Sequence, residues 1–287
     1  MNKKKLSGEE KHLLEQFIIP FFHFGKRFPL LPGKNDIDAE AGLIGIDGAE
    51  LKKYREDFDK VAKQAALELL KENDIVDLID KMPFDGEEVI VAIGDSITED
   101  AQGWFNIFKH VLEISVENAG FTFVNAGIAF DTTTDVLRRF DRDVLIHEPD
   151  WVFIALGTFD AQRLNISYDK PLISLSETWE NMETIQQLVE DRVENPPVWI
   201  TPAPVISELL DENLLYDFTI HKTDLAQVQQ IVAGKQGVIV DPLGRRMGKE
   251  SPEAWNYLSD GLHPSLLGHM NTVREVIKKL ATANKDK

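Results

Sequence analysis

A serine, an aspartate and a histidine occur in this chain in settings that suit ester hydrolysis. Ser96 belongs to the stretch Gly-Asp-Ser-Ile-Thr at 94–98, directly after an apolar run, and Asp260 and His263 belong to Asp-Gly-Leu-His-Pro at 260–264. Ester hydrolysis by serine needs a base for the hydroxyl proton, an acid that orients the base, and N–H donors for the oxyanion. Because Asp260 precedes His263 by one turn, its carboxylate can hold Nδ1–H while Nε2 faces Ser96.

The elements that must position these residues alternate along the chain from residue 88 onward. Short apolar strands are predicted at 89–93, 121–124, 151–156, 198–200 and 238–240, and helical patterns separate or follow them. This alternation predicts an α/β fold, a parallel sheet of five strands with helices on both faces. The loops at the carboxyl ends of such strands meet at one edge of the sheet. The sequence therefore predicts that these loops bring Ser96, Asp260 and His263 together.

Two further loops at the same predicted edge supply candidate site residues. Gly127 follows the second strand, and its backbone N–H can approach an oxyanion closely because glycine has no side chain. The loop after the third strand reads Gly-Thr-Phe-Asp at 157–160. Asp95, Phe159 and Asp160 are the expected substrate-lining residues.

These blocks, in this order, resemble the GDSL or SGNH hydrolase superfamily over roughly the last two thirds of the chain. The resemblance implies a flavodoxin-like α/β/α sandwich in three layers, with Ser96 as nucleophile, His263 as base and Asp260 as the residue that orients it. It also implies that no cofactor is needed and that the N–H groups of Ser96 and Gly127 are oxyanion donors. The expected function is a serine esterase or acylhydrolase that cleaves small acyl esters through an acyl-enzyme.

One residue departs from the family pattern. The family's third oxyanion donor is an asparagine side chain, and Phe159 occupies its place here. If that donor is missing, turnover is slow and Phe159→Asn raises kcat; alternatively, Phe159 closes an apolar pocket and Asn125 or Asn165 donates instead. The departure also allows a catalytically weak or inactive ligand-binding protein on the same scaffold.

Other sites at these residues have weaker support in the sequence. An α/β-hydrolase elbow requires a second glycine where Thr98 stands, and a phosphate at Ser96 would be repelled by Asp95, Glu99 and Asp100. The remaining histidines lack metal-ligand spacing, so no metal site is predicted. His269, a conceivable alternative base, falls inside a helical pattern away from the loop.

Composition limits the partners and the compartment. The net charge of −18 repels nucleic acid and anionic lipid surfaces, so neither is an expected partner. No apolar run reaches the length of a membrane helix, and no apolar signal-peptide core follows the basic first residues. The absence of cysteine excludes disulfides and thiolate chemistry. The expected location is the cytoplasm.

The first 84 residues differ from the rest and are predicted to form a mainly helical extension before a hydrolase domain at 85–287. A long amphipathic helix is expected over residues 51–69. Five phenylalanines crowd together between residues 17 and 28, interrupted by proline and glycine. Such aromatic side chains either pack on the main domain or on a second subunit, which allows a homo-oligomer, or they wall an acyl pocket.

Overall fold

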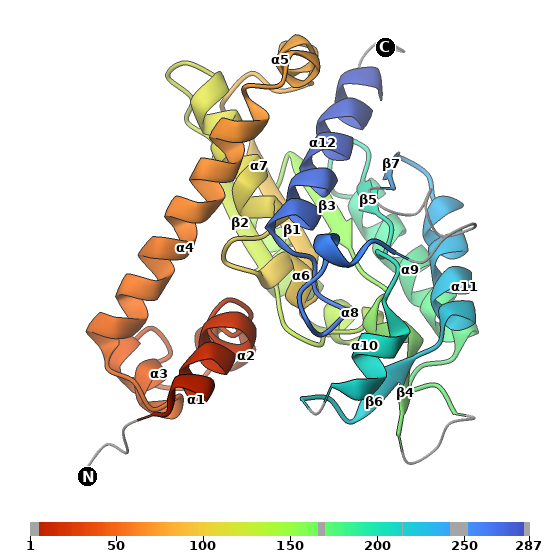
Figure 1. Ribbon diagram of the computed structural model, residues 1–287. Helices are drawn as coiled ribbons and strands as arrows, with labels where there is room; N and C mark the ends of the chain where they lie inside the picture. The colour runs from red at the N-terminus through yellow and green to blue at the C-terminus, as the bar shows by residue number, and fades with distance from the viewer. Residues whose placement is uncertain (1–5, 166–169, 214, 242–251, 284–287) are drawn as a thin grey trace.

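A five-stranded parallel sheet forms the centre of the molecule (Figure 1). The computed structural model describes residues 6–165, 170–213, 215–241 and 252–283. The strands are β1 (Val89–Gly94), β2 (Thr122–Gly127), β3 (Trp151–Ala155), β5 (Val198–Ile200) and β7 (Val238–Val240), in the order β2-β1-β3-β5-β7. Counted along the sheet's own strands, this is the flavodoxin-like order 2-1-3-4-5. The predicted α/β class and five-stranded parallel sheet are confirmed.

The interior strand β1, which lies between β2 and β3, is buried on both faces, which explains its uninterrupted apolar sequence. Ile90 and Ala92 belong to the core on one side of the sheet, whereas Val91 and Ile93 belong to the core on the other. Successive side chains of a strand point to opposite faces, so a strand covered on both sides must be apolar at every position. The strand register aligns Gly94 with Gly127 and Ala155, which brings the ends of three strands to one edge.

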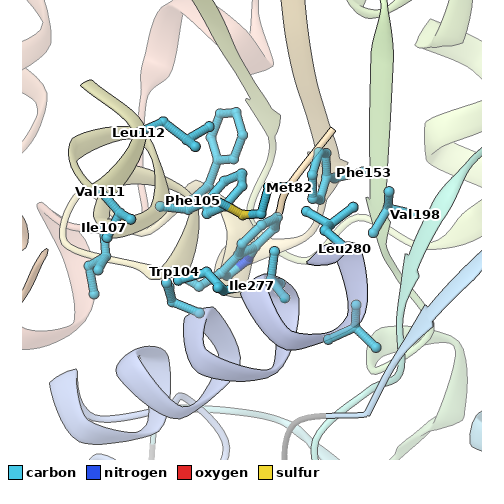
Figure 2. Close-up of a cluster of buried hydrophobic side chains, with 14 of the residues drawn as sticks. Met82, Trp104, Phe105, Ile107, Val111, Leu112, Phe153, Val198, Ile277 and Leu280 are labelled. Carbon is cyan, nitrogen blue, oxygen red and sulfur yellow. The ribbon is translucent and has the colours of Figure 1, made fainter. Parts of the chain in front are cut away.

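Helices cover both faces of the sheet and make the outer layers. On one face α7 (Trp104–Ser115) and α12 (Leu266–Ala283) pack together, and α4 (Gly48–Leu69) lies on the outside of α7. Figure 2 shows side chains of α7 and α12 meeting those of the strands in this core. The other face carries α8 (Thr133–Asp143), α9 (Leu175–Glu190) and α11 (Lys222–Ala233). Helix, sheet and helix thus form the expected three layers.

The N-terminal region is helical, as expected. It contains α1 (Gly8–Leu13), a helical stretch at Leu14–Ile18, α2 (Phe24–Arg27), α3 (Ile37–Leu43), α4 and α5 (Asn73–Ile79). Ile19, Ala41, Ile46 and Leu51 form a small core that joins the stretch Leu14–Ile18, α3 and the first half of α4. The second half of α4 and α5 pack instead on the main core beside α7 and α12. Between Leu14–Ile18 and α2, the chain turns toward the loops that follow β1 and β2.

Three short elements, two strands and a helix, were not expected from the sequence. A two-stranded antiparallel sheet pairs β4 (Gln162–Leu164) with β6 (Phe218–Ile220), and α10 (Ser207–Glu212) lies between β5 and β6. Unlike β5 and β7, which are equally short but wholly apolar, β4 reads Gln-Arg-Leu and β6 reads Phe-Thr-Ile, so neither forms an uninterrupted apolar run that would predict a buried strand. Within the described ranges, no helix is both long and apolar enough to cross a membrane.

Candidate active site

Ser96 is the first residue of α6 (Ser96–Glu99), a short helix that begins where β1 ends. Asp95 caps this helix, since its Oδ1 accepts the N–H of Ile97 at 2.9 Å. Gly94 is required at the turn, because a Cβ there would lie 2.2 Å from Thr98 Oγ1 and 2.7 Å from the carbonyl oxygen of Ala155. The sequence Gly-Asp-Ser thus places the serine hydroxyl at the carboxyl edge of the sheet.

Ser96, His263 and Asp260 form a continuous chain of hydrogen bonds. Ser96 Oγ lies 2.8 Å from His263 Nε2, and His263 Nδ1 lies 2.6 Å from Asp260 Oδ2. All three residues are buried. The other carboxylate oxygen of Asp260 accepts the backbone N–H groups of Leu262 and His263, both at 3.0 Å. These two bonds fold the 260–263 turn around its own carboxylate, and so fix the imidazole relative to Ser96.

The surroundings of Asp260 keep it ionised. Burial alone would raise its pKa, but the hydrogen bond and charge of His263, with the two backbone N–H groups, outweigh burial and hold the pKa of Asp260 below its ordinary value. A carboxylate at this position favours the imidazole tautomer with its proton on Nδ1. The lone pair of Nε2 then faces the serine hydroxyl.

Tyr216 joins this network, although no sequence pattern predicted it. Its hydroxyl donates to Asp260 Oδ2 at 2.9 Å, and its ring centroid lies 6.4 Å from that of His263. Burial, and then the negative charge of Asp260, raise the pKa of Tyr216 above its ordinary value, so the hydroxyl keeps its proton. Tyr216 stands just before β6, outside any motif, so no local pattern could have identified it.

Phe21 of the N-terminal extension is a second unexpected neighbour of the base. Its ring stacks on the imidazole of His263 with a centroid distance of 4.2 Å and an interplanar angle of 27°. Phe21 is itself buried. The sequence predicted that phenylalanines of this region would pack on another surface, and for Phe21 that surface is the base of the candidate triad.

Gly127 does not offer the free N–H expected of it. Its N–H donates to Asn125 Oδ1 at 3.0 Å, and a Cβ at Gly127 would lie 2.5 Å from the backbone nitrogen of Glu99. This glycine therefore allows β2 and α6 to pack closely. The Asn125 amide is also engaged, since Nδ2 donates to the carbonyl of Thr98 at 2.6 Å. Asn165 lies exposed just after β4.

A different amide of the β2–α8 loop is available. From residue 127 to 133 the backbone N–H groups donate to protein oxygens at every position except 130; the acceptors belong to Asn125, Gly94, Glu99, Ile128, Asp135 and Asp160. Phe130 has a φ of +65°, in the left-handed region that residues with a side chain rarely adopt. Its N–H has no acceptor within the described residues. A left-handed backbone position is usually recognised in a sequence by a glycine, so the phenylalanine at 130 gave no indication of this conformation.

Phe159 lies within an aromatic cluster. Its ring is fully buried and makes edge contacts with Phe130 at 5.4 Å and Phe218 at 5.9 Å between centroids. An apolar, close-packed environment of this kind suits a phenyl ring but provides no hydrogen-bond partner for a side-chain amide. Of the two expectations for Phe159, the packing agrees with the one in which the ring closes an apolar region.

Asp95 and Asp160 are buried carboxylates near the site. Burial raises the pKa of Asp95 to about 7 and that of Asp160 to about 6, in spite of the hydrogen bonds each accepts. Asp160 accepts from the Thr133 N–H at 3.1 Å and from the Thr178 hydroxyl at 3.2 Å, so it links the loop after β3 to α8 and α9. These bonds give Asp160 a structural role.

His269 has both ring nitrogens engaged away from Ser96. Its Nδ1 accepts the backbone N–H of Trp104 at 3.2 Å, and Nε2 lies 3.1 Å from Asp100 Oδ2. With Nδ1 accepting, the proton is on Nε2, and no lone pair is left for a serine. Among the residues that the structure describes, no group of three or more histidine, cysteine, aspartate or glutamate side chains could hold a metal ion.

Comparisons with known proteins agree with this arrangement. Residues 92–270 match the model of the GDSL-like lipase/acylhydrolase family. A protein named "Uncharacterized lipoprotein YqeF" from Bacillus subtilis (strain 168) is 34% identical over 142 residues, 46% of this chain. The alignment spans 55% of that protein's length.

Two solved structures share the fold. The acetylxylan esterase of Geobacillus stearothermophilus superimposes with a TM-score of 0.54 at 21% identity, covering 69% of this chain and 96% of that one. The lipase/acylhydrolase of Enterococcus faecalis superimposes with a TM-score of 0.55 at 25% identity, covering 68% of this chain and 96% of that one. The family match spans most of the chain and contains all of Ser96, Asp260 and His263, so this chain belongs to the GDSL-like lipase/acylhydrolase family.

Proposed function

We propose that the protein is a serine esterase that hydrolyses small acyl esters through an acyl-enzyme. The observation that carries this proposal is the buried chain of hydrogen bonds from Ser96 through His263 to Asp260, at 2.8 and 2.6 Å. Nucleophile, base and orienting acid are within hydrogen-bond reach of one another without any rearrangement.

The reaction follows from the roles of these groups. Ser96 Oγ attacks the ester carbonyl carbon while His263 Nε2 takes the hydroxyl proton, and Asp260 stabilises the imidazolium that forms. His263 then gives the proton to the departing alcohol oxygen as the acyl-enzyme forms. A water molecule, activated by the same nitrogen, releases the acid and restores Ser96.

The oxyanion of the tetrahedral intermediate needs fixed donors. We propose the N–H groups of Ser96 and Phe130 for this role. Ser96 is the first residue of α6, where a helix leaves its N–H groups without internal partners. The Phe130 N–H is the only amide of residues 127–133 without an acceptor in the described structure, and replaces Gly127 in this proposal.

The substrate class proposed is a neutral ester of a short acid. The net charge of −18 disfavours anionic esters. The rings of Phe130 and Phe159 lie together at the loop that carries the proposed oxyanion donor, which favours a compact apolar acyl group. An acetyl ester is the simplest such substrate, and the Geobacillus stearothermophilus relative is named an acetylxylan esterase.

The test is labelling by a fluorophosphonate, which reacts with an activated serine. The parent protein should be labelled and should hydrolyse p-nitrophenyl acetate, and Ser96→Ala should lose both properties while keeping the circular dichroism spectrum. Ser176→Ala, a change of the same kind at an exposed serine, is the matched control. Equal labelling of the parent and Ser96→Ala would remove the assignment of Ser96 as nucleophile.

A second candidate is a catalytically weak or inactive ligand-binding protein on the same scaffold. Its supporting observation is Phe159, which occupies the place of the family's asparagine donor and is fully buried. The same experiment separates the two candidates, because only the esterase candidate predicts hydrolysis of acetyl esters and reaction with the fluorophosphonate.

Location and assembly remain proposals. We propose a cytoplasmic location, although the Bacillus subtilis relative is named a lipoprotein. Fractionation of the native cells separates the two locations.

We also propose a homo-oligomer formed through the extension, where Leu30 and Leu43 are exposed. Light scattering on the full chain tests this proposal.

A further inference from the structure

The N-terminal extension reaches into the candidate active site through the segment Ile19–Phe21. All three residues of this segment are buried. Ile19 packs into the small core of the extension, and Phe21, two residues later, stacks on the imidazole of His263 at 4.2 Å. The segment therefore connects the core of the extension directly to the catalytic base.

Polar contacts on both sides of Phe21 fix this segment to the hydrolase loops. Before it, the Pro20 carbonyl accepts the Ala101 N–H at 2.9 Å. After it, the N–H and Nδ1 of His23 lie 3.1 and 3.0 Å from Glu99 Oε1. Glu99 is buried and belongs to α6, the helix that carries Ser96. Phe21 is thus held relative to the nucleophile as well as to the base.

The helix that follows Phe21, α2, is fixed to the β2–α8 loop, which carries the proposed oxyanion donor Phe130. Arg27 Nη1 lies 2.8 Å from the buried carboxylate of Asp131, and Nη2 donates to the carbonyl of Ala129 at 2.7 Å. These two residues flank Phe130. Displacement of α2 would take from the buried Asp131 carboxylate one of its two arginine partners, and a buried carboxylate with fewer partners is less stable. Such anchoring is typical of a permanent wall and not of a lid that opens at each turnover.

The stacked ring has two physical consequences for the base. It covers one face of the imidazole, so His263 is restrained by Ser96 and Asp260 in its plane and by Phe21 above it. It also presents a π-face to a ring that becomes positively charged in the transition state, an arrangement that stabilises cations. Both effects favour proton transfer by His263 without any contact between Phe21 and Ser96.

The position of Phe21 also determines which part of the ester it meets. The departing alcohol oxygen receives its proton from His263 Nε2, so the alcohol part lies beside the imidazole. We infer that Phe21 is a positioning residue for His263 and a wall of the alcohol-binding side of the site. This inference rests on the proposed esterase function. It assigns to the extension, which has no counterpart in the motifs of the family, a role in selecting the alcohol.

The experiment compares Phe21→Ala, Phe21→Leu and Phe21→Tyr with the parent in the full chain. Phe22→Ala is the matched control, because Phe22 is the next residue and is 38% exposed. Two acetates of similar intrinsic reactivity serve as substrates, ethyl acetate with a small alcohol and cyclohexylmethyl acetate with a bulky one. Melting temperature and fluorophosphonate labelling are recorded for each variant.

Phe21→Ala should lower kcat for ethyl acetate by roughly 3- to 10-fold, the scale of one aromatic contact. It should also raise the relative kcat/KM for cyclohexylmethyl acetate, because space opens beside the leaving group. Phe21→Tyr should restore both values, and Phe21→Leu should restore packing and melting temperature without restoring kcat. If Phe21→Ala does not fold, Phe21→Leu against Phe21→Tyr gives the same comparison.

The outcomes separate this inference from the proposed function. If the parent hydrolyses acetates and is labelled, and every folded Phe21 variant has the parent's kcat and substrate ratio, Phe21 is a packing residue and the inference is overturned. If the parent itself is inactive and unlabelled, the esterase proposal has failed and the inference falls with it. A loss of kcat in Phe22→Ala equal to that in Phe21→Ala would also overturn it.

Discussion

The hydroxyl of Tyr216 donates a hydrogen bond to Asp260 Oδ2, the same oxygen that lies 2.6 Å from His263 Nδ1. This carboxylate therefore receives four hydrogen bonds, two from backbone N–H groups and two from side chains. The tyrosine hydroxyl and the imidazole share one acceptor, Asp260 Oδ2. Loss of the tyrosine hydroxyl should therefore change how Asp260 holds the imidazole.

Tyr216→Phe should lower kcat modestly and leave KM nearly unchanged. The variant removes one bond to a buried carboxylate that keeps three others, a loss of about 1 kcal/mol or roughly 5-fold if it is felt only in the transition state. Steady-state kinetics on a short acetyl ester measure the effect. Asp260→Asn should be far more severe, because an amide can select the wrong imidazole tautomer. Equal losses in the two variants would show that Tyr216, and not the carboxylate, orients the base.

Phe130 provides a pair of variants that differ mainly in the backbone. Phe130→Gly keeps the N–H and relieves the left-handed φ of +65°, so kcat should stay within a few-fold of the parent. Phe130→Pro removes the N–H and fixes φ near −65°, so kcat should fall by about 10²- to 10³-fold, the scale of one oxyanion donor. Circular dichroism and melting curves check that both variants fold. If Phe130→Pro kept the parental kcat, the Phe130 N–H would not be the oxyanion donor, and another group would have to fill that role.

Phe159→Asn should destabilise the protein and should not raise kcat. The substitution places an amide at a fully buried position whose neighbours are the rings of Phe130 and Phe218. Loss of the ring should cost about 3 kcal/mol or more of unfolding free energy, with the unpaired amide adding to this cost. Urea unfolding and steady-state kinetics test the two halves of this prediction. Phe159→Leu, which keeps the site apolar, should cost less, and a rise in kcat for Phe159→Asn would restore the view that an oxyanion donor is missing.

The buried carboxylate of Asp160 predicts a stability that falls as pH rises. Its pKa is about 6 in the folded protein, raised by burial, and about 3.9 in an unfolded chain. Between these values the folded state binds more protons than the unfolded state. Its stabilising contribution is therefore complete below pH 4 and is lost as pH rises through 6, by about 3 kcal/mol. The raised pKa of Asp95, about 7, acts in the same direction up to a slightly higher pH.

The check is the unfolding free energy measured by urea titration from pH 4 to pH 8. Asp160→Asn should flatten the fall between pH 4 and pH 6, whatever its effect on absolute stability. Asp141→Asn, a change at an exposed aspartate, is the control and should leave the slope unchanged. If the unfolding free energy of Asp160→Asn fell with pH as steeply as that of the parent, groups other than Asp160 would be responsible for the pH dependence.

The sequence predicted most of the sheet because its strands are buried on both faces and their apolar runs are uninterrupted. β1 and β3 were found within one residue, and the turn at Gly94 follows from the close approach of Thr98. The arrangement of Ser96, Asp260 and His263 followed from their loops, since parallel strands bring these loops to one edge. Local patterns were sufficient wherever the determining contacts were local or were set by the sheet.

The parts that were not predicted depend on contacts between distant segments. Tyr216 and Phe21 reach His263 from loops without periodicity, and nothing in their neighbours encodes the contact. Phe130 adopts a backbone conformation that sequence reasoning assigns to glycine. Gly127 was expected to donate to a substrate because glycine permits close approach, but the group that approaches is the backbone of α6.

The contact between Phe21 and His263 joins a residue that is translated early to one that is translated late. While the ribosome makes the strands and helices between them, Phe21 has no imidazole to stack on, and Asp131 and Glu99 must be synthesised before Arg27 and His23 find their partners. The adjacent pair Phe21 and Phe22 is therefore uncovered on the nascent chain, a condition that promotes aggregation and chaperone binding. The stack can form only after residue 263 has been synthesised, so the proposed wall of the alcohol-binding side is completed after the strands and helices that lie between these two residues.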